Sequence, residues 1–500
     1  MIVENWLFMS NMLKNNFLRI FIALALIMLG QTTANSQGSV IVNSQLSTIN
    51  SQLSIVNSLD SLIQAKLPKG GQVGVSVFDL GDGQQLYAYQ ADRLCRPAST
   101  QKLITAITAL NQPRAQEPFR TEVWYKGEIA NDTLRGDIYI VGGMDPELME
   151  TALDTLIDLA AALPFHVLGG QVYGDVSMKD SLYWGKGWLW DDNPESFQPY
   201  LSPLMLNKGF VKVAAIPTNP GEPARLEVKP SSTYFNIINE TKTRTSSAGK
   251  FTVMRDWMNN ANDITVGGNI TARRVEEINV YSSQDFFMHT FLERLGTKFT
   301  LMQPWYNFAE LQKDSTCQLI AVYETSVQKV LKQMMKESDN LNAEAMFTRL
   351  GVQVSGNSHV SAEESIKAVQ ALVRVMGLNP DDYRIADGCG LSMYDYVSPE
   401  LLVAFLRYAY ADNRIFPHLF RALPVSGVDG TLKNRMRKGS PAYQQVHAKT
   451  GSYTGISTLA GYLETNSKRY LAFAIMCQNQ LKASEARALQ DAICEMLVKQ

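Results

Sequence analysis

A serine and a lysine near the start of one predicted helix are the residues whose types and spacing most directly suggest chemistry. Ser99 and Lys102 lie three residues apart within 96–110, where a proline precedes apolar residues at helical spacing. Both side chains should therefore share one helix face. A serine hydroxyl at the positive end of a helix is a candidate nucleophile, and a lysine one turn away can take its proton if the pKa of that lysine is lowered.

The Ser-x-x-Lys spacing is not specific by itself. It occurs again at Ser247 and Lys250, in a polar loop, and at Ser326 and Lys329, in a helical pattern whose lysine is expected to face solvent. An exposed serine and lysine that share a helix face are the ordinary interpretation of such a pair. Further motifs are needed before chemistry can be assigned to Ser99.

Two further motifs lie in the second half of the chain. Ser338 and Asn340 form a Ser-x-Asn motif in a turn between two helical segments. Lys449, Thr450 and Gly451 follow in a strand that is predicted to start near residue 445. A glycine there allows a close backbone approach along the strand edge. The three motifs together favour a functional role for Ser99 and Lys102 over an accidental pair.

In this order the motifs resemble those of the penicillin-recognising serine hydrolases. Over roughly residues 60–500, the chain resembles the low-molecular-mass class C penicillin-binding proteins, which are D-alanyl-D-alanine carboxypeptidases and endopeptidases of the bacterial envelope. The stretches that carry the resemblance are Pro97–Leu103, Lys336–Glu344, Asp387–Ser392, Val428–Arg435 and Ala448–Gly451. The family usually has serine where this chain has Cys389, and a smaller residue where it has Met144.

The resemblance implies an acyl-enzyme mechanism on peptides that end in D-Ala-D-Ala or are cross-linked through D-Ala. Ser99 would be the nucleophile and Lys102 the general base, while Ser338 would relay a proton to the leaving amine. The free pKa of lysine is about 10.4, so the pKa of Lys102 must be lowered, and burial and the second cation at Lys449 should both lower it. The two lysines should titrate as a coupled pair.

The resemblance also implies a set of substrate-binding residues. These are Asn340, Lys449, Thr450, Gly451 and Ser452. The backbone N–H groups of Ser99 and Ser452 would form an oxyanion hole. β-Lactam antibiotics, which mimic the substrate, are the expected inhibitors.

Asp145 is a possible substrate-side residue in the Gly-rich turn 142–146. The resemblance suggests that this loop approaches the mouth of the site, where a carboxylate could meet the amino group of a diamino acid in the stem peptide. A simple Asp-Pro turn is the alternative. The aromatic stretch 188–192 also resembles a loop of the family's inserted region, with an aromatic core patch as the equal alternative.

The long segment between Lys102 and Ser338 is rich in predicted strands. They span Thr121–Ile129, Leu134–Val141, Val167–Asp175, Lys208–Ile216, Ala224–Val228 and Ile264–Ile270. We therefore expect an α/β (α+β) protein: a transpeptidase/β-lactamase-like catalytic domain, with an antiparallel sheet flanked by helices, interrupted by one or two β-rich inserted domains. The expected boundaries are 59–116 and 313–500 for the discontinuous catalytic domain and 117–312 for the insert.

The N-terminus is predicted to be a targeting signal rather than part of the folded domain. Lys14 and Arg19 precede the apolar run 21–29, and small and polar residues follow, which is typical of a signal peptide over 1–34. An uncleaved anchor helix is the alternative. A low-complexity, heptad-like spacer over 35–58 follows. The mature chain is therefore expected in the periplasm, with no integral membrane segment.

Composition excludes several other functions. The chain has 500 residues with 46 Lys+Arg, 48 Asp+Glu and a net charge of -2, which argues against nucleic-acid binding. The five cysteines include no Cys-x-x-Cys motif, and the five histidines never adopt a metal-ligand spacing. We therefore expect no metal and no cofactor. Oligomeric state, and the balance between carboxypeptidase and endopeptidase activity, stay open.

Two rival functions share part of this pattern. A β-lactamase would have all three motifs but needs a group that activates the deacylating water, and no Glu-x-x-Leu-Asn-type loop lies between the second and third motifs. A non-catalytic wall-binding or sensor protein would usually have lost Ser99, Lys102 or Lys449. All three are present.

Overall fold

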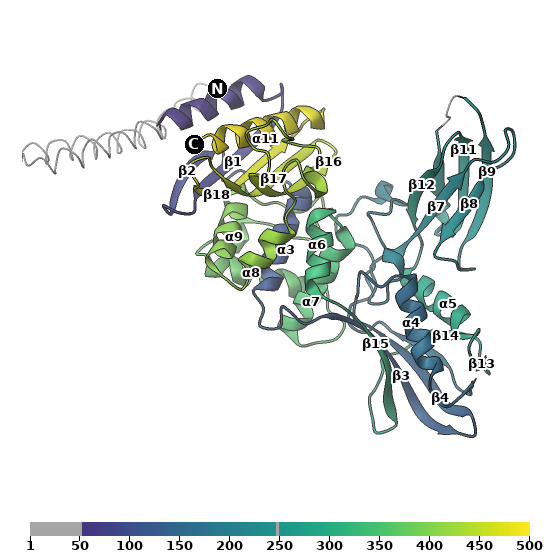
Figure 1. Ribbon diagram of the computed structural model, residues 1–500. Helices are drawn as coiled ribbons and strands as arrows, with labels where there is room; N and C mark the ends of the chain where they lie inside the picture. Colours follow the sequence, from purple (N-terminus) through teal and green to yellow (C-terminus); the bar gives the residue numbers. More distant parts are fainter. Residues whose placement is uncertain (1–52, 247–249) are drawn as a thin grey trace, which may run out of the picture. The chain divides into compact units, whose positions relative to one another are not determined.

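The structure is a computed structural model that describes residues 53–246 and 250–500 (Figure 1). The predicted signal peptide, 1–34, and the spacer up to residue 52 lie outside the described residues. The chain divides into two compact units, one that ends at Lys66 and one formed by Leu67–Gln500. In the first unit, residues 53–66 form a helix. Among the described helices, none combines the length and apolar character that crossing a bilayer requires.

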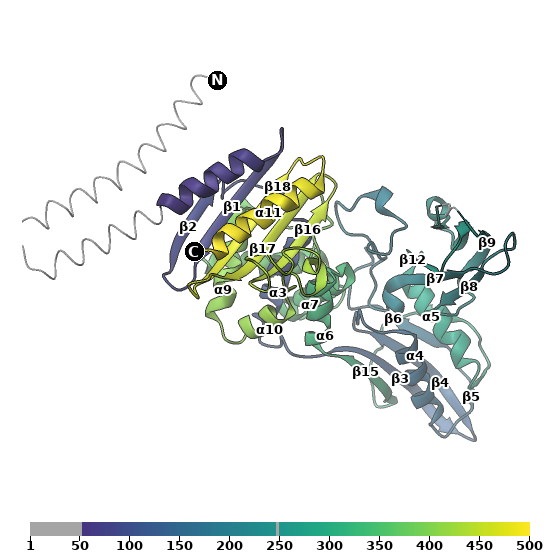
Figure 2. The ribbon, with the colours of Figure 1, turned by 45° about the horizontal axis from the view of Figure 1, so that its top comes forward.

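The catalytic part of the second unit is built on a five-stranded antiparallel sheet in the order β16-β17-β18-β1-β2. Its strands are β1 (Gln72–Asp79), β2 (Gln84–Tyr89), β16 (Val446–Tyr453), β17 (Ile456–Glu464) and β18 (Tyr470–Gln478). Strands β17 and β18 are buried along almost their whole length, so both faces of the sheet are covered. Helix α11 (Ala483–Val498) covers one face and α9 (Pro399–Ala411) the other (Figure 2).

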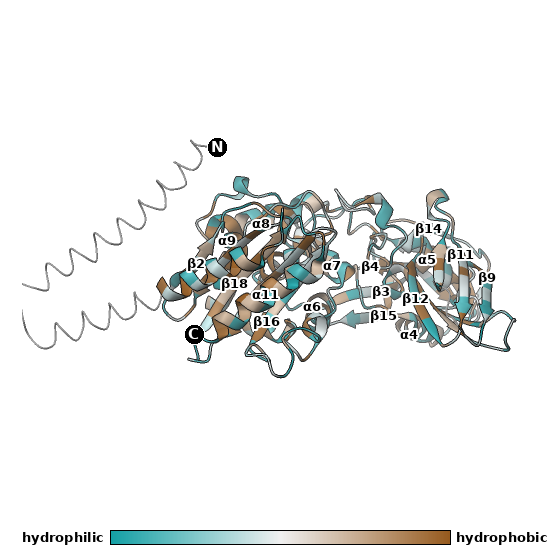
Figure 3. Cartoon of the chain, turned by 90° about the horizontal axis from the view of Figure 1, so that it is seen from above, coloured by the Kyte–Doolittle hydropathy of each residue, from teal (hydrophilic) through white to brown (hydrophobic). Residues whose placement is uncertain are grey.

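Helix α3 (Gln101–Leu110) is the centre of the helical layer, and every one of its residues is buried. The other helices of this layer are α6 (Val327–Lys336), α7 (Asn340–Ser355), α8 (Ala362–Val375) and α10 (Phe416–Ala422). Hydrophobic residues concentrate in β18 and α9, which form the core between sheet and helices (Figure 3). The predicted fold class, an antiparallel sheet flanked by helices and interrupted by a β-rich insert, is confirmed.

The inserted segment contains three sheets. The largest has the order β13-β5-β4-β3-β15, with β6 and β14 paired at its side, and the smaller two have the orders β10-β11-β9 and β12-β7-β8. The strands are β3 (Phe119–Ala130), β4 (Thr133–Gly142), β5 (Val167–Leu168), β6 (Val172–Asp175), β7 (Phe210–Ile216), β8 (Arg225–Lys229), β9 (Asn236–Thr243), β10 (Thr252–Arg255), β11 (Asp263–Ile270), β12 (Arg274–Asn279), β13 (Thr300–Leu301), β14 (Tyr306–Phe308) and β15 (Cys317–Thr325). The insert also contains two helices that its predicted strands did not include, α4 (Glu150–Ala161) and α5 (Ser283–Leu295).

Strand β15 bears on where the insert ends. It pairs antiparallel with β3 from Cys317 to Thr325, so these residues complete the sheet of the insert. The sequence placed the boundary at residue 312. The division into domains stays a prediction, and this pairing favours an insert that continues to Thr325.

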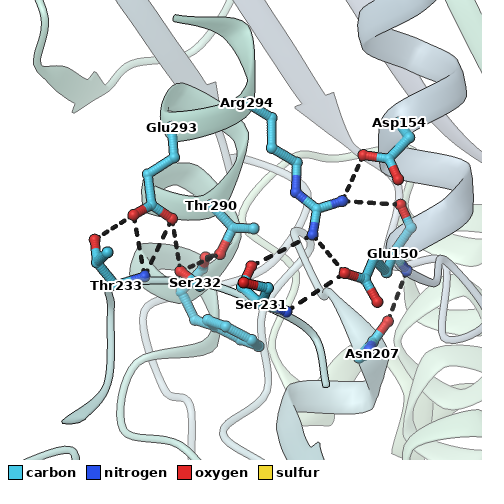
Figure 4. A network of polar contacts seen from close by, with 10 residues as sticks. Glu150, Asp154, Asn207, Ser231, Ser232, Thr233, Thr290, Glu293 and Arg294 are labelled. Carbon is cyan, nitrogen blue, oxygen red and sulfur yellow. Dashed lines mark hydrogen bonds and ion pairs between the residues drawn. The ribbon is translucent and has the colours of Figure 1, made fainter. Parts of the chain in front are cut away.

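Polar contacts join the two helices of the insert to a neighbouring turn (Figure 4). Arg294 on α5 forms an ion pair with Glu150 on α4 at 2.8 Å. Glu293, the preceding residue, accepts hydrogen bonds from the Ser232 hydroxyl and the Thr233 backbone N–H. The turn at 231–233 is thereby held against both helices.

The buried aromatic face of α5 should carry much of the insert's stability. Replacing Phe291, which has no exposed surface, with alanine should lower the free energy of unfolding by about 3–5 kcal/mol because a large cavity is left in the core. Replacing Leu159 on α4, which is 47% exposed, should cost less than about 1 kcal/mol. Urea unfolding of both variants measures the difference, and equal losses would contradict this packing.

Candidate active site

Ser99 lies in a single 3-10 turn, η1 (Ala98–Thr100), that leads directly into α3. Ala98 has φ 46°, a left-handed conformation that is costly for a residue with a Cβ. The edge strand β16 runs close to this turn because Gly451 has no side chain. A Cβ at Gly451 would lie 2.7 Å from the carbonyl oxygen of Pro97 and 3.0 Å from the backbone nitrogen of Ser99. The nucleophile turn and β16 can therefore meet only at a glycine.

Lys102 is fully buried and its amine has three hydrogen-bond partners. Nζ lies 2.9 Å from Ser99 Oγ, 2.6 Å from Asn340 Oδ1 and 2.7 Å from the carbonyl oxygen of Cys389. The amide and carbonyl oxygens can only accept, so they take the two protons of a neutral amine. The lone pair is then directed at the Ser99 hydroxyl. This is the arrangement that removal of the serine proton requires.

Burial is the main reason why the pKa of Lys102 is below its usual value. The neighbouring acidic groups, Cys389 and Asp387 first among them, act in the opposite direction. The pKa of Lys449 lies well below its usual value, first because of burial and then because of the charge of Lys102. Burial thus acts on the pKa of Lys102 in the expected direction, and the repulsion between the two lysines acts on the pKa of Lys449.

Lys449 connects the third motif to the second. Its amine is fully buried and donates to Ser338 Oγ at 2.8 Å and to the carbonyl oxygen of Thr450 at 2.8 Å. Ser338 adopts a left-handed conformation, with φ 61°, in the turn before α7. Its hydroxyl is therefore held beside Lys449 while remaining partly exposed.

Asn340 is the first residue of α7, and the turn before it is fixed from two sides. Asp339 caps the helix by accepting the backbone N–H of Asn342 at 2.9 Å. Lys208 of the insert forms an ion pair with the same Asp339 carboxylate. The side-chain amide of Asn340 donates to the carbonyl oxygen of Phe197, also from the insert, at 2.8 Å. The insert thus helps to position the second motif.

The predicted substrate-binding residues of the third motif lie along an edge strand. Thr450 is partly exposed, and its hydroxyl donates to the hydroxyl of Thr431 at 2.8 Å. Ser452 is exposed two residues further along β16. Residues 446–448 of β16 bond to residues 424–426, so the part of its outer edge that can pair with an extended peptide begins at Lys449.

A buried acidic cluster supports the carbonyl group that binds Lys102. One acceptor or donor atom from each of Glu344, Asp387 and Cys389 lies within 4.8 Å of the others. The Asp387 carboxylate accepts from the Trp188 indole at 2.8 Å and from the Cys389 thiol at 3.4 Å. Glu344 accepts the backbone N–H of Gly388 at 2.9 Å. With these oxygens already hydrogen-bonded, we assign the cluster to holding the loop rather than to binding a metal ion.

The charge of this cluster follows from its burial. Burial raises the pKa of Glu344 to about 8, and the charge of Asp387 acts in the same direction. Burial also raises the pKa of the Cys389 thiol well above its usual value. Near neutral pH the thiol therefore keeps its proton and donates it in a hydrogen bond.

The loop of the insert at 188–200 contributes contacts that the sequence left open. Trp188 is buried and bonds Asp387, so the aromatic stretch is partly core. The Tyr453 hydroxyl at the end of β16 donates to the carboxylate of Asp192. The cluster of aromatic and acidic residues at 188–192 was the sequence signal for a contact in this loop. The contact with Tyr453 could not be predicted, because Tyr453 is distant in the sequence.

Asp145 does not lie where a substrate could reach it. Its side chain is buried, with 1% exposure, and Oδ1 accepts the backbone N–H of Glu147 at 2.9 Å. Burial raises its pKa to about 6. Met144 beside it is fully buried in the core. The turn at 142–146 is therefore a packed structural turn, and Asp192 is the insert carboxylate beside β16.

The fold and the Ser–Lys geometry together define a penicillin-recognising serine hydrolase. A model of the D-Ala-D-Ala carboxypeptidase 3 (S13) family matches residues 55–500, and the chain belongs to this family of peptidases. The D-alanyl-D-alanine carboxypeptidase DacB of Haemophilus influenzae is 27% identical over 421 residues, which cover 82% of this chain and 85% of that protein. A D-alanyl-D-alanine carboxypeptidase of an Actinomadura species is 28% identical over 463 residues, or 88% of this chain and 84% of that protein.

A solved structure supports the same fold. The crystal structure of penicillin binding protein 4 (dacB) from Haemophilus influenzae superposes with a TM-score of 0.75 at 24% identity, covering 88% of this chain and 99% of that chain. The resemblance stated from the motifs is confirmed, and the chain is a peptidase of this family.

The pH dependence of acylation should report the neutral form of Lys102. The rate constant for acylation by a penicillin should rise with pH through the pKa of Lys102, because only the unprotonated amine can accept the Ser99 proton. Since burial lowers that pKa from 10.5, the rising limb should lie below pH 10.5. Stopped-flow acylation across pH measures it.

The second Ser-x-x-Lys pair provides the control for this profile. Lys329→Met, which alters a lysine with 47% side-chain exposure, should leave the profile unchanged, whereas Lys102→Met should abolish acylation. A rising limb at the ordinary lysine value would contradict the role of burial.

The thiol of Cys389 should be replaceable by another small donor. Cys389→Ser should acylate at close to the wild-type rate, because a hydroxyl can still donate to the buried carboxylates. Cys389→Ala leaves those carboxylates without this donor and should lower the free energy of unfolding by about 1–3 kcal/mol. Urea unfolding and penicillin labelling of both variants test this, and equal stability of the two would be the contrary result.

Proposed function

We propose that this chain is a serine-type D-Ala-D-Ala carboxypeptidase, D,D-endopeptidase or both, which acts on peptidoglycan stem peptides through an acyl-enzyme on Ser99. The observation that carries the proposal is the pair of contacts around two buried amines. Lys102 Nζ lies 2.9 Å from Ser99 Oγ, and Lys449 Nζ lies 2.8 Å from Ser338 Oγ. Each hydroxyl is partly exposed while each amine is buried.

The first half of the reaction transfers an acyl group to the serine. Lys102 takes the proton of the Ser99 hydroxyl, and the oxygen attacks the carbonyl carbon of the penultimate D-Ala. The backbone N–H groups of Ser99 and Ser452 stabilise the oxyanion, and the loss of one such donor typically costs about 10²–10³ in rate. Ser338 passes a proton to the leaving amine as the peptide bond breaks, and the proton that Lys102 took from Ser99 replaces it, so that Lys102 is neutral again before water arrives.

The second half releases the enzyme. Water adds to the ester carbonyl, its proton goes to Lys102, and the bond to Ser99 breaks to restore the hydroxyl. If the leaving group was a single D-Ala the reaction is a carboxypeptidase step, and if it was the amine of a cross-link the reaction is an endopeptidase step. The chemistry at Ser99 is the same in both.

The terminal carboxylate of the substrate fits the third motif. Lys449 and Thr450 would hold it, and the edge of β16 would pair with the peptide backbone. A bound carboxylate stabilises the charged form of Lys449, so substrate binding should raise a pKa that burial holds down. Asn340 would orient the substrate amide while it holds Lys102.

Asp192 replaces Asp145 in our proposal as the carboxylate that meets an amino group of the stem peptide. It accepts a hydrogen bond from Tyr453, at the end of the strand that carries Lys449 and Thr450. A diamino acid in the third position of the stem would place its amine near this wall.

β-Lactams are the expected inhibitors, because they acylate the same serine and resist hydrolysis. The penicillin binding protein 4 of Haemophilus influenzae has been solved in complex with a novel β-lactam, and that structure superposes on this chain with a TM-score of 0.69. Export to the periplasm is part of the proposal. Its support is the signal-like pattern at 1–34 together with a substrate that lies outside the cytoplasm.

Fluorescent-penicillin labelling tests the nucleophile. Wild type should label and Ser99→Ala should lose at least about 10³-fold of the labelling rate, because the acylated oxygen is gone. Ser326→Ala, which alters the other described Ser-x-x-Lys serine, should label normally.

The same preparations should then be given cross-linked muropeptides and a free pentapeptide that ends in D-Ala-D-Ala. Wild type should cleave at least one of the two, and Ser99→Ala neither. Labelling of Ser99→Ala would refute the nucleophile. A wild type that labels but cleaves neither substrate would refute the hydrolase and favour a sensor, and rapid turnover of nitrocefin would favour a β-lactamase.

A further inference from the structure

A cavity of about 520 Å³ lies in the inserted segment, which is within the size range of small-ligand sites. Its lining comes from two stretches of the loop 176–203, from residues 281–285 at the start of α5, from residues 308–310, and from His359, which lies outside the inserted segment. None of the active-site residues described above lines this cavity, so it is a second site.

Three tyrosines form an aromatic wall of the cavity. Tyr183 and Tyr281 each pack against Tyr200 with ring centroids 5.3 Å apart. The Tyr200 hydroxyl accepts a hydrogen bond from Asn193 at 3.0 Å, which fixes the centre of the wall. Tyr183 is 46% exposed, and within the described chain no hydrogen-bond partner of the Tyr183 or Tyr281 hydroxyl is found. The wall therefore offers the exposed ring surface of Tyr183 and free hydroxyl groups.

The charged residues of the lining leave an acidic balance. Lys179 forms an ion pair with Asp180, so these two charges compensate each other. Asp285 accepts the Tyr306 hydroxyl at 3.1 Å, and Glu310 has an exposed side chain for which the described residues provide no partner. The remaining charge is negative. An anionic ligand would be repelled, while a neutral ligand with hydroxyl and amide donors would find acceptors.

We propose that this cavity binds a neutral amino-sugar chain, the glycan strand to which the stem peptides of peptidoglycan are attached. The inference rests on the proposed function and names the part of the substrate that the Ser99 site does not hold. A pyranose ring has an apolar face that can lie on a tyrosine ring and a rim of hydroxyl and acetamido groups that can bond carboxylates. The free stem peptide carries carboxylates, which suit this acidic cavity poorly.

The loop 176–203 connects the cavity to the catalytic centre. At its base, the backbone N–H of Leu201 donates to the carbonyl oxygen of Tyr183 at 2.9 Å, which joins the two stretches that line the cavity. Towards its tip, Asp192 accepts from Tyr453 and the carbonyl oxygen of Phe197 accepts from Asn340. A glycan held at the base would therefore present its peptide to the tip. Glycan binding at this cavity stabilises the bound substrate and the transition state equally, so it should lower KM and leave kcat unchanged.

Binding and kinetics with two defined probes test the proposal. The probes are chitotetraose, a neutral amino-sugar chain, for binding, and glycan-linked pentapeptide for kinetics. Calorimetry should detect binding of chitotetraose to wild type and about tenfold weaker binding to Tyr183→Ala and to Glu310→Gln, because a stacking ring or a charged acceptor is lost. Leu182→Ala, which alters an adjacent side chain with 66% exposure, is the matched control and should bind like wild type.

The kinetic readout separates this site from the Ser99 site. In Tyr183→Ala, KM for glycan-linked pentapeptide should rise about tenfold at unchanged kcat, while hydrolysis of free pentapeptide and penicillin labelling stay as in wild type. Glycan probes that fail to bind wild type, or that bind all variants equally, would overturn the proposal. So would an equal rise of KM for the free pentapeptide, which would assign the cavity to the peptide. A wild type that neither labels nor hydrolyses free pentapeptide would instead refute the proposed function.

Discussion

The amine of Lys102 is the interaction on which the rest of the site depends. A lysine with no exposed surface is costly to keep charged, so burial favours the neutral amine of Lys102 although the nearby acidic groups act in the opposite direction. Two fixed oxygens, from Asn340 and from the Cys389 carbonyl, accept its protons, and the third direction leads to Ser99. The amine of Lys102 loses its solvation by water. In return it is aligned with Ser99 as a base before the substrate binds.

Each of these contacts requires support from a distant part of the chain. The Cys389 carbonyl is held by a loop that the buried Asp387 carboxylate organises, and Trp188 from the insert completes that carboxylate's hydrogen bonds. Asn340 is held by an insert carbonyl group and by the capped start of α7. The insert, which separates the first two motifs in the sequence, thus contacts the residues that hold Lys102 in place.

The sequence predicted the catalytic half of this arrangement well because the relevant signals are local. Ser99 lies in the turn that leads directly into the helix of Lys102, strand β18 is a nearly continuous apolar run, and the three motifs are short. Burial of Lys102 could be inferred from the apolar residues around it.

The contacts across the insert could not be predicted, because they join residues that are far apart in the chain. Asp145 in a Gly-rich turn attracted a functional interpretation, yet it is buried, whereas Asp192 lies beside Tyr453. Helices α4 and α5 were missed among strong strand patterns. The pairing of β15 with β3, which favours a boundary after Thr325, could not be predicted because β3 lies far earlier in the chain.

The catalytic role of Lys102 requires that burial lower the pKa of its amine, and a direct titration of that amine tests this requirement most sharply. Protein labelled with ¹³C at the lysine ε-carbons would be followed by NMR across pH, with the Lys102 signal assigned from its loss in Lys102→Arg. We predict that this signal titrates below the ordinary value of 10.5, while exposed lysines titrate near it. A Lys102 signal that titrates at or above the ordinary value in the free enzyme would contradict the role of Lys102 as general base.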